Sequence, residues 1–131
     1  MRNLILASLL AMPLFSGCAA AVIGVGAGIV ASQELLDNDT YVSHLNQDVK
    51  HVWPVVKTYL SDASPDLIEV DEALRVAQAR IDGSLVTVSV EAYDIDRCIM
   101  KVGARRYGVN DGEMAGLVVE RLHKRLSDQG R

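Results

Sequence analysis

The chain has 131 residues, a length typical of one domain after a targeting segment is removed. Half of the residues are hydrophobic but only 5% are aromatic, so we expect a core built mainly from aliphatic side chains. The formal net charge of −4 argues against nucleic acid as a partner, because non-specific nucleic-acid binding requires a basic surface. It also argues against a purely electrostatic attraction to anionic lipid.

The N-terminal segment contains the three parts of a secretory signal. Arg2 gives a short basic start, residues 4–15 form an apolar run, and the small residues Ser16 and Gly17 lie just before Cys18. Small residues are required there because the peptidase cleft admits little side chain beside the bond that it cuts. Export from the cytoplasm is therefore expected.

Residues 14–18 resemble the bacterial lipobox, in which lipid is attached to the cysteine and the chain is cleaved just before it. Phe15 stands where leucine is usual, whereas the small residues and the cysteine fit the motif. The sequence thus predicts a signal peptide at residues 1–17, cleavage between Gly17 and Cys18, and lipid on Cys18.

Lipidation at Cys18 determines the expected location. The resemblance implies a diacylglycerol on the Cys18 sulfur and, in many bacteria, a further acyl chain such as palmitate on its amine. Each buried methylene contributes about 0.8 kcal/mol, so two or more chains anchor a protein stably. Ala19 is uncharged, which by resemblance to lipoproteins of Gram-negative bacteria favours the outer membrane, with the domain facing the periplasm. The membrane is therefore the first expected partner.

An uncleaved membrane anchor is the alternative interpretation of the same segment. No charge occurs in residues 4–31, a stretch long enough to cross a bilayer. Arg2 would then remain on the inner side. In both interpretations the rest of the chain lies outside the cytoplasm.

Residues 18–39 are expected to form a Gly/Ala-rich tether. The glycines around Gly24 lack the spacing and the strand–turn–helix context of a dinucleotide-binding loop. Gly24 and Gly28 form a small-xxx-small pair, which can bring two helices together in lipid, but a flexible apolar tether against the bilayer is favoured. Residues 33–39 become polar and acidic, which marks the passage to a single folded domain at residues 40–131.

The folded domain is expected to begin with a strand at residues 40–45 and an amphipathic helix. Asn46 is the expected helix N-cap and Asp48 an acid of the first turn. Pro54 is expected to kink the helix or weaken its middle turn, and the helix is expected to end before Ser61. Its apolar stripe consists of Val49, Val52, Trp53, Val56 and Leu60.

A β-hairpin is predicted around Asp82 and Gly83, a strong two-residue turn signal. The composition of residues 71–79 favours a helix, but the register favours strands at residues 75–81 and 85–92. A two-residue turn would place apolar residues opposite apolar residues on one face of the hairpin. The expected pairs are Ala79 with Val86, Ala77 with Val88, Gln78 with Thr87, and Arg80 with Leu85.

A further strand and a final helix complete the prediction. Residues 97–104 alternate, with Cys98 on the apolar side, and a three-residue loop at residues 94–96 keeps the apolar faces of neighbouring strands together. Asn110 and Glu113 resemble a capping box that begins the last helix. Its apolar stripe consists of Met114, Leu117, Val118, Leu122 and Leu126.

These elements predict an α+β fold, a two-layer sandwich in which two helices cover one face of an antiparallel sheet of about four strands (β-α-β-β-β-α). The lipobox at Cys18, the Asp82-Gly83 hairpin and the helix at residues 111–126 resemble those of a small family of bacterial lipoproteins described only as a domain of unknown function. The resemblance covers nearly the whole chain, and Pro54 departs from it. It implies no substrate, cofactor or catalytic residue.

Candidate catalytic or metal-binding residues are few. His44, His51 and His123 lie on different predicted elements, without the spacing of a metal site, so no metal is expected. Cys98 is expected in the core as an inert thiol, and a disulfide with Cys18 is the alternative.

The favoured function is a non-enzymatic binding or structural module that has no cofactor and whose partner is another envelope component. The alternative is a small envelope enzyme or ligand carrier with a pocket between sheet and helices. The one basic cluster is expected to be a solvated strand end and consists of Lys101, Arg105 and Arg106. The preferred contact surface is the exposed sheet face with Ser89, Glu91, Arg97 and Lys101.

Overall fold

The computed structural model of the chain describes residues 29–129, so the predicted processing residues Gly17 and Cys18 lie outside the described part. Within residues 29–129 the chain forms two helices and seven strands, which confirms the α+β class. In chain order these are β1 (Val30–Leu35), β2 (Tyr41–Leu45), α1 (Val49–Ala63), β3 (Glu69–Asp71), β4 (Val76–Ile81), β5 (Ser84–Asp94), β6 (Arg97–Arg106), β7 (Val109–Asn110) and α2 (Gly112–Gln129).

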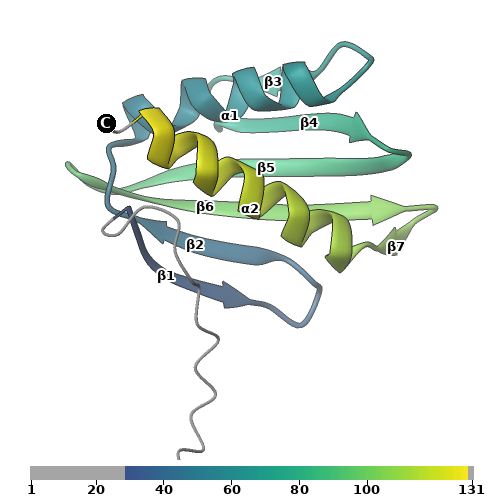
Figure 1. Cartoon of the computed structure of the whole chain (residues 1–131), viewed down its shortest axis with the longest axis horizontal. Helices are drawn as coiled ribbons and strands as arrows, with labels where there is room; N and C mark the ends of the chain where they lie inside the picture. Colours follow the sequence, from purple (N-terminus) through teal and green to yellow (C-terminus); the bar gives the residue numbers. More distant parts are fainter. Residues whose placement is uncertain (1–28, 130–131) are drawn as a thin grey trace, which may run out of the picture.

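The strands form one antiparallel sheet in the order β1-β2-β6-β5-β4-β3, and β7 pairs with β6 (Figure 1). The expectation of about four strands was wrong, because β1, β3 and β7 were not predicted. β3 and β7 are only three and two residues long, and every residue in them is exposed. β1 lies within residues 18–39, where a tether was expected, so pairing in the sheet already begins at Val30.

The predicted β4–β5 hairpin is confirmed in its register. Ala79 pairs with Val86 and Ala77 with Val88, and all four of these side chains are buried. The two other predicted pairs are also present. The turn at Asp82 and Gly83 has positive φ at both residues, which is the backbone that a tight two-residue hairpin requires.

The parity of the β5–β6 pair is also as expected, so the apolar sides of both strands face the same layer. Val88 lies opposite Val102 and Ala92 opposite Cys98. The connection differs in detail from the predicted three-residue loop, because β5 continues to Asp94 and the register shifts between Ala92 and Asp94.

Both helices are present, but each is capped by an aspartate and not by the predicted asparagine. Asp48 caps α1, and its Oδ1 accepts a hydrogen bond from the Lys50 amide at 3.1 Å, so the prediction of Asn46 as cap was wrong. Asn110 belongs to β7, and Asp111 accepts the Met114 amide at the start of α2. A carboxylate at either position also suits the positive end of the helix dipole.

The first helix is longer than expected. α1 continues without interruption through Pro54, whose ring lies on the exposed side, and it ends at Ala63 and not before Ser61. Pro54 lies in the first half of the helix, where its missing N–H removes one backbone hydrogen bond without breaking the element.

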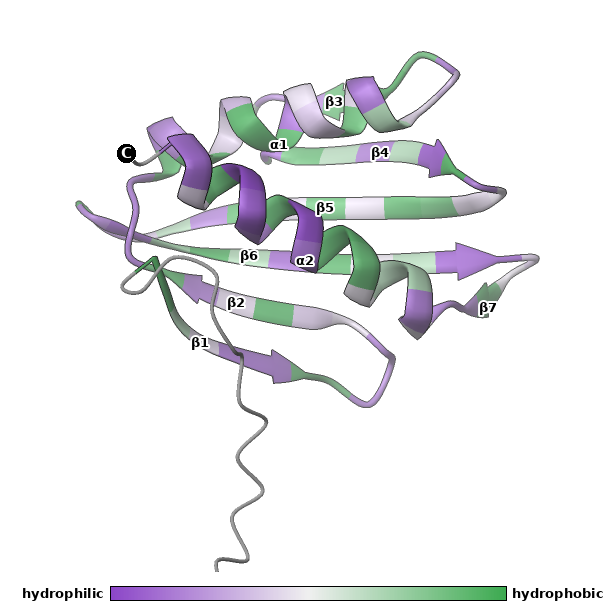
Figure 2. Ribbon diagram, in the orientation of Figure 1, coloured by the Kyte–Doolittle hydropathy of each residue, from purple (hydrophilic) through white to green (hydrophobic). Residues whose placement is uncertain are grey.

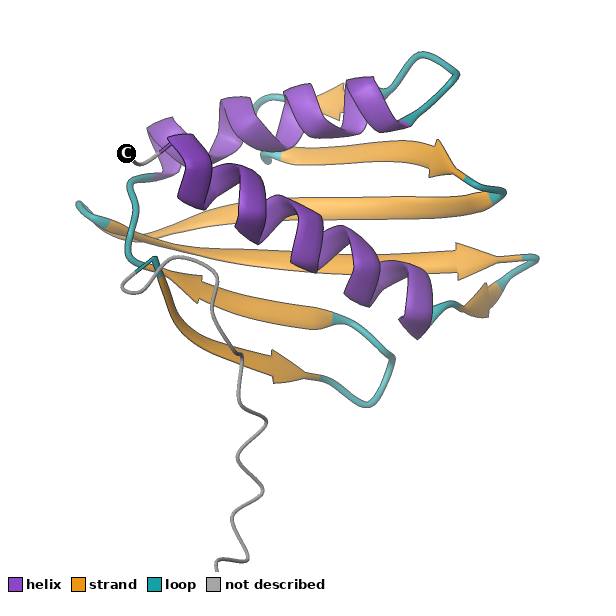
Figure 3. Cartoon of the chain, viewed as in Figure 1, coloured by secondary structure: helices purple, strands orange, loops and turns teal. Residues whose placement is uncertain are grey.

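Within residues 29–129, the two helices cover one face of the sheet and no element covers the other face, which we call the uncovered face (Figures 1 and 3). α1 packs against β4 and β5, and α2 packs against β6, β2 and β5. In Figure 2 apolar and polar segments alternate along the strands, as expected when one face is buried and the other is wet. The most deeply buried large side chains lie between the layers: Leu45, Val52, Val56, Leu60, Val86, Val88, Val90, Met100, Val102, Val118, Leu122 and Leu126.

The interior of this sandwich is filled by side chains. Of the predicted stripe on α2, Met114, Val118, Leu122 and Leu126 are buried, whereas Leu117 is only partly buried at the margin of the core.

Within residues 29–129, neither helix has both the length and the apolar character needed to cross a bilayer.

Candidate functional site

The uncovered face of the sheet carries the four residues that were expected to form a contact surface. Ser89 lies opposite Lys101 in the β5–β6 pair, and Lys101 Nζ lies 3.7 Å from Glu91 Oε1. Arg97 pairs with Asp94 at 2.8 Å, which raises the pKa of Arg97 and lowers the pKa of Asp94. The charges of this patch therefore neutralise one another locally and leave no unpaired ion for a partner.

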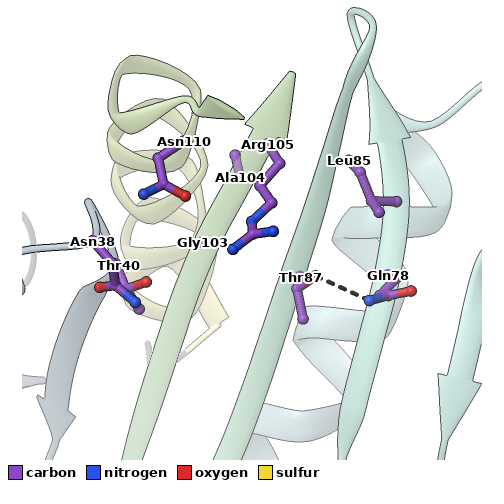
Figure 4. Close-up of a pocket in the computed structure, with 9 residues that line it drawn as sticks. All are labelled: Asn38, Thr40, Gln78, Leu85, Thr87, Gly103, Ala104, Arg105 and Asn110. Atoms are coloured by element: carbon purple, nitrogen blue, oxygen red, sulfur yellow. Dashed lines mark hydrogen bonds between the residues drawn. The ribbon is translucent and has the colours of Figure 1, made fainter. Parts of the chain in front are cut away.

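A pocket of about 360 Å³ lies on the same uncovered face, near the end of β6 that leads into β7 (Figure 4). Residues from four neighbouring strands and from the β1–β2 turn line it. We call it the Gly103 pocket, and its lining consists of Asn38, Thr40, Gln78, Leu85, Thr87, Gly103, Ala104, Arg105 and Asn110.

The Gly103 pocket lies where β6 has a glycine, which has no side chain, and where no strand pairs with one edge of β6. On one side of β6, β2 reaches only as far as Tyr41, opposite Val102, while β7 begins its pairing at Asn110, opposite Arg105. Neither strand therefore lies beside Gly103. At this position a Cβ atom would contact Thr40 Oγ1 at 3.4 Å, so the glycine keeps the floor of the pocket free of a side chain.

Arg105 and Arg106 are adjacent in sequence but point to opposite faces of the sheet. Arg106 is engaged by the fold: its Nε donates to Ser84 Oγ at 3.2 Å and lies 3.6 Å from Asp111 Oδ2, and its Nη2 donates to the Asp82 carbonyl. In Figure 4 the Arg105 side chain extends over the uncovered face toward Gly103. Within residues 29–129, no hydrogen bond or ion pair engages the Arg105 guanidinium.

Asp111 follows the lining residue Asn110 in sequence, and both of its carboxylate oxygens have hydrogen-bond partners outside the pocket lining. Ser84 Oγ donates to Asp111 Oδ2 at 2.6 Å, and the Met114 amide donates to Oδ1 at 3.1 Å. The Ser84 hydroxyl, then the Met114 amide and the Arg106 guanidinium, hold the pKa of Asp111 below its ordinary value. The predicted basic cluster is thus divided among different partners, and Arg105 is its one unengaged member within the described residues.

A smaller cavity of about 190 Å³ lies near the opposite end of β6, beside the start of β1. His44 and Tyr93 meet edge to face there at 6.4 Å between ring centroids, and the Arg97 guanidinium lies 5.1 Å from the Tyr93 ring. His44, Tyr93 and Arg97, which line this cavity, are thus in contact with one another.

The histidines do not converge, and no group of three metal-ligating side chains occurs within the described residues. His51 is exposed on α1, whereas His123 is buried between α2 and β2, where its Nε2 lies 2.9 Å from Ser43 Oγ. Burial lowers the pKa of His123.

Cys98 lies in the core, as expected, and only 1% of its surface is exposed. Burial raises the pKa of its thiol to about 11, so the reactive thiolate is scarce at neutral pH. Its predicted alternative partner, Cys18, lies outside the described residues.

Sequence reasoning missed the Gly103 pocket, although one signal for it was present. Gly103 interrupts an otherwise continuous alternating strand, and a glycine inside a strand often marks a place where a ligand or another backbone approaches closely. Gln78 and Thr87 were predicted to pair across the hairpin, but nothing indicated that they also line a pocket.

No protein-family model, curated protein or solved structure matches this chain. The resemblance to a family of small bacterial lipoproteins therefore stays a prediction. Function is inferred from the residues and their geometry alone.

Proposed function

We propose that this chain is a lipid-anchored binding module of the bacterial envelope. Residues 1–17 are a signal peptide, cleavage occurs between Gly17 and Cys18, and acyl chains on Cys18 hold the domain on the periplasmic side of a membrane, the outer membrane being favoured. The domain itself is non-enzymatic and binds its partner through the uncovered face of the sheet.

The uncovered face is the observation that carries this proposal. Two helices bury one face of the sheet, while among residues 29–129 no element covers the other face, which contains the Gly103 pocket. An antiparallel sheet with one packed face is a rigid platform, and rigid elements position binding groups well.

The chemistry of the pocket supports binding over catalysis. Its polar lining residues are asparagine, glutamine, threonine and arginine, which orient ligands through hydrogen bonds and charge. Proton transfer near neutral pH usually employs histidine or a carboxylate, and the nine lining residues include neither.

A ligand carrier with its pocket between sheet and helices is supported less well. The residues that face each other across the two layers, such as Val88, Met100 and Leu122, have no exposed surface. The space between the layers is therefore occupied by close-packed side chains.

The proposed anchor keeps the domain close to the bilayer. A chain of this length between Cys18 and Ile29 spans at most roughly 40 Å when fully extended. Confinement within such a distance of a membrane raises the effective concentration of any binding partner in the same compartment.

The anchor is tested by acyl labelling in a Gram-negative host with an alkyne analogue of palmitate. The wild-type chain and a Cys98→Ala control are expected to carry the label, to lack residues 1–17 and to sediment with outer membranes in a density gradient. Cys18→Ala is expected to remain unlabelled and to retain residues 1–17. An unlabelled wild-type chain, or a labelled Cys18→Ala chain, would refute the proposal.

A further inference from the structure

We infer that the Gly103 pocket binds a small polar molecule or chain end through a carboxylate group, and that Arg105 recognises this carboxylate. The inference rests on the proposed function, because it specifies what the uncovered face binds. It draws on three features of the pocket: its charge, its hydrogen-bonding groups and its size.

The positive charge of the lining favours a negatively charged ligand. Arg105 is the only charged residue among the nine that line the pocket, and no acidic side chain accompanies it. Three aspartates adjoin lining residues in sequence, Asp37, Asp39 and Asp111, and none of them belongs to the lining. Asp111 caps α2, and the Asp39 side chain lies beside Gly112. The guanidinium is thus available to a ligand, whereas the neighbouring Arg106 is held by Ser84 and Asp111.

A single guanidinium favours a carboxylate over a phosphate. Its planar fork matches the two oxygens of a carboxylate in a bidentate pair, and one positive charge balances one negative charge. Phosphate sites usually add further cations or a free helix N-terminus. The N-terminus of α2 lies near the pocket, but the Asp111 carboxylate already accepts its Met114 amide.

The remaining polar groups suit a ligand with amide or hydroxyl groups beside the carboxylate. Gln78 Nε2 donates to Thr87 Oγ1 at 3.2 Å, and the Gln78 carbonyl oxygen and the Thr87 hydroxyl hydrogen can each make a further hydrogen bond. Asn38, Thr40 and Asn110 add donors and acceptors on the opposite side, and Leu85 adds one apolar wall.

The size of the pocket limits the ligand. A volume of about 360 Å³ corresponds to about a dozen water molecules at roughly 30 Å³ each. It also lies within the lower part of the range for small-molecule sites, which begins at about 300 Å³. The ligand portion inside the pocket therefore has on the order of a dozen non-hydrogen atoms.

The test is a titration of the uniformly ¹⁵N-labelled full chain in detergent micelles, followed by two-dimensional NMR. Two probes of similar size distinguish the sources of the carboxylate: N-acetyl-glycyl-alanine represents a peptide chain end, and gluconate represents a free polar acid. The C-terminal amide of the same dipeptide removes the charge at nearly the same size, and methyl phosphate offers the competing anion.

At least one carboxylate probe is expected to shift the backbone signals of Gly103, Thr87 and Gln78, with little change on α1. Arg105→Gln is expected to weaken this binding about tenfold or more, the loss typical of a charged hydrogen-bond partner. Arg121→Gln removes the same charge from the exposed face of α2 and is the matched control, with affinity expected to stay unchanged. Gly103→Val places a side chain in the pocket and is expected to abolish the shifts.

Several outcomes would overturn the inference. The first is that neither carboxylate shifts the signals of the pocket residues at concentrations up to about 10 mM, ten times a millimolar dissociation constant. The second and third are that the dipeptide amide binds as tightly as the dipeptide, or that methyl phosphate binds more tightly. The fourth is that the Arg105→Gln chain binds as tightly as the Arg121→Gln chain. None of them depends on Cys18, so failure of the carboxylate site and failure of the lipid anchor are distinguished.

Discussion

Gly103→Ala is expected to stabilise the folded chain by about 0.5–1 kcal/mol, which is unusual for a substitution inside a strand of a packed sheet. The new methyl group would project onto the uncovered face and not into the core. Its nearest neighbour would be Thr40 Oγ1 at 3.4 Å, an ordinary van der Waals distance. The gain arises because alanine has less conformational freedom than glycine in the unfolded chain.

Gly83 in a turn and Gly112 at the start of α2 supply the contrast. Gly83 has φ of +83° in the β4–β5 turn, so Gly83→Ala forces an L-residue into the left-handed region and is expected to cost about 1–2 kcal/mol. At Gly112 a Cβ atom would lie 3.1 Å from Asp39 Cβ, so the Asp39 side chain would have to move. Of these three glycines, only Gly103 combines an ordinary backbone conformation with a Cβ contact no shorter than 3.4 Å.

Equilibrium unfolding in urea measures both changes. Trp53 is the only tryptophan and is buried in α1, so its fluorescence reports the packing of helix on sheet. The midpoint for Gly103→Ala is expected to rise by about 0.5 M with an unchanged slope, given slopes of about 1–3 kcal/mol/M for small domains. A midpoint that falls by a similar amount would show that the pocket floor is not open, and the reasoning about Gly103 would be refuted.

Three further predictions concern single residues. Burial lowers the pKa of His123, so the unfolded chain binds a proton at this residue more tightly than the folded chain does. The urea midpoint is therefore expected to fall as the pH drops below the ordinary histidine pKa of about 6.5. His123→Gln should flatten this dependence of the midpoint on pH, and an unchanged dependence in the variant would contradict the prediction. Arg106→Gln is expected to cost about 1 kcal/mol in urea unfolding, while Arg105→Gln should stay within about 0.5 kcal/mol, because only Arg106 of the two is hydrogen-bonded within the described residues. Equal losses would contradict this difference. The Cys98 thiol is expected to react with a disulfide reagent at pH 8 only as fast as the protein unfolds, and rapid labelling of the folded protein would disprove its burial.

The central hairpin could be predicted because local and long-range signals agree there. The Asp82-Gly83 turn fixes which residues lie opposite each other, and only that register brings Ala77 and Ala79 to the same face as Val86 and Val88. Two helices, each with an apolar stripe, then have to bury these stripes against the same face of the sheet. These features depend on the period of side chains along the sequence, which is visible without a structure.

The edges of the sheet could not be predicted in the same way. β1 carries Ser32, Gln33 and Glu34, and an edge strand with few buried residues leaves no alternating pattern to recognise. The helix caps were displaced by one or two positions because Asn46 and Asp48, like Asn110 and Asp111, are all good capping residues.

The Gly103 pocket depends on tertiary structure. Its lining residues lie far apart in the sequence, from Asn38 to Asn110. Its floor lies where β2 and β7 both end beside β6. Sequence alone identified Arg105 only as a member of a basic cluster. The side of the sheet to which it points, and the engagement of Arg106 by Asp111, distinguish the two arginines.

The intact mass of the protein purified from the membrane fraction tests the proposed envelope anchor most directly. The account predicts a chain that starts at Cys18 and carries the added mass of a diacylglyceryl group and a fatty acyl group at that residue. A mass equal to the unmodified residues, with a free thiol at Cys18, would contradict it.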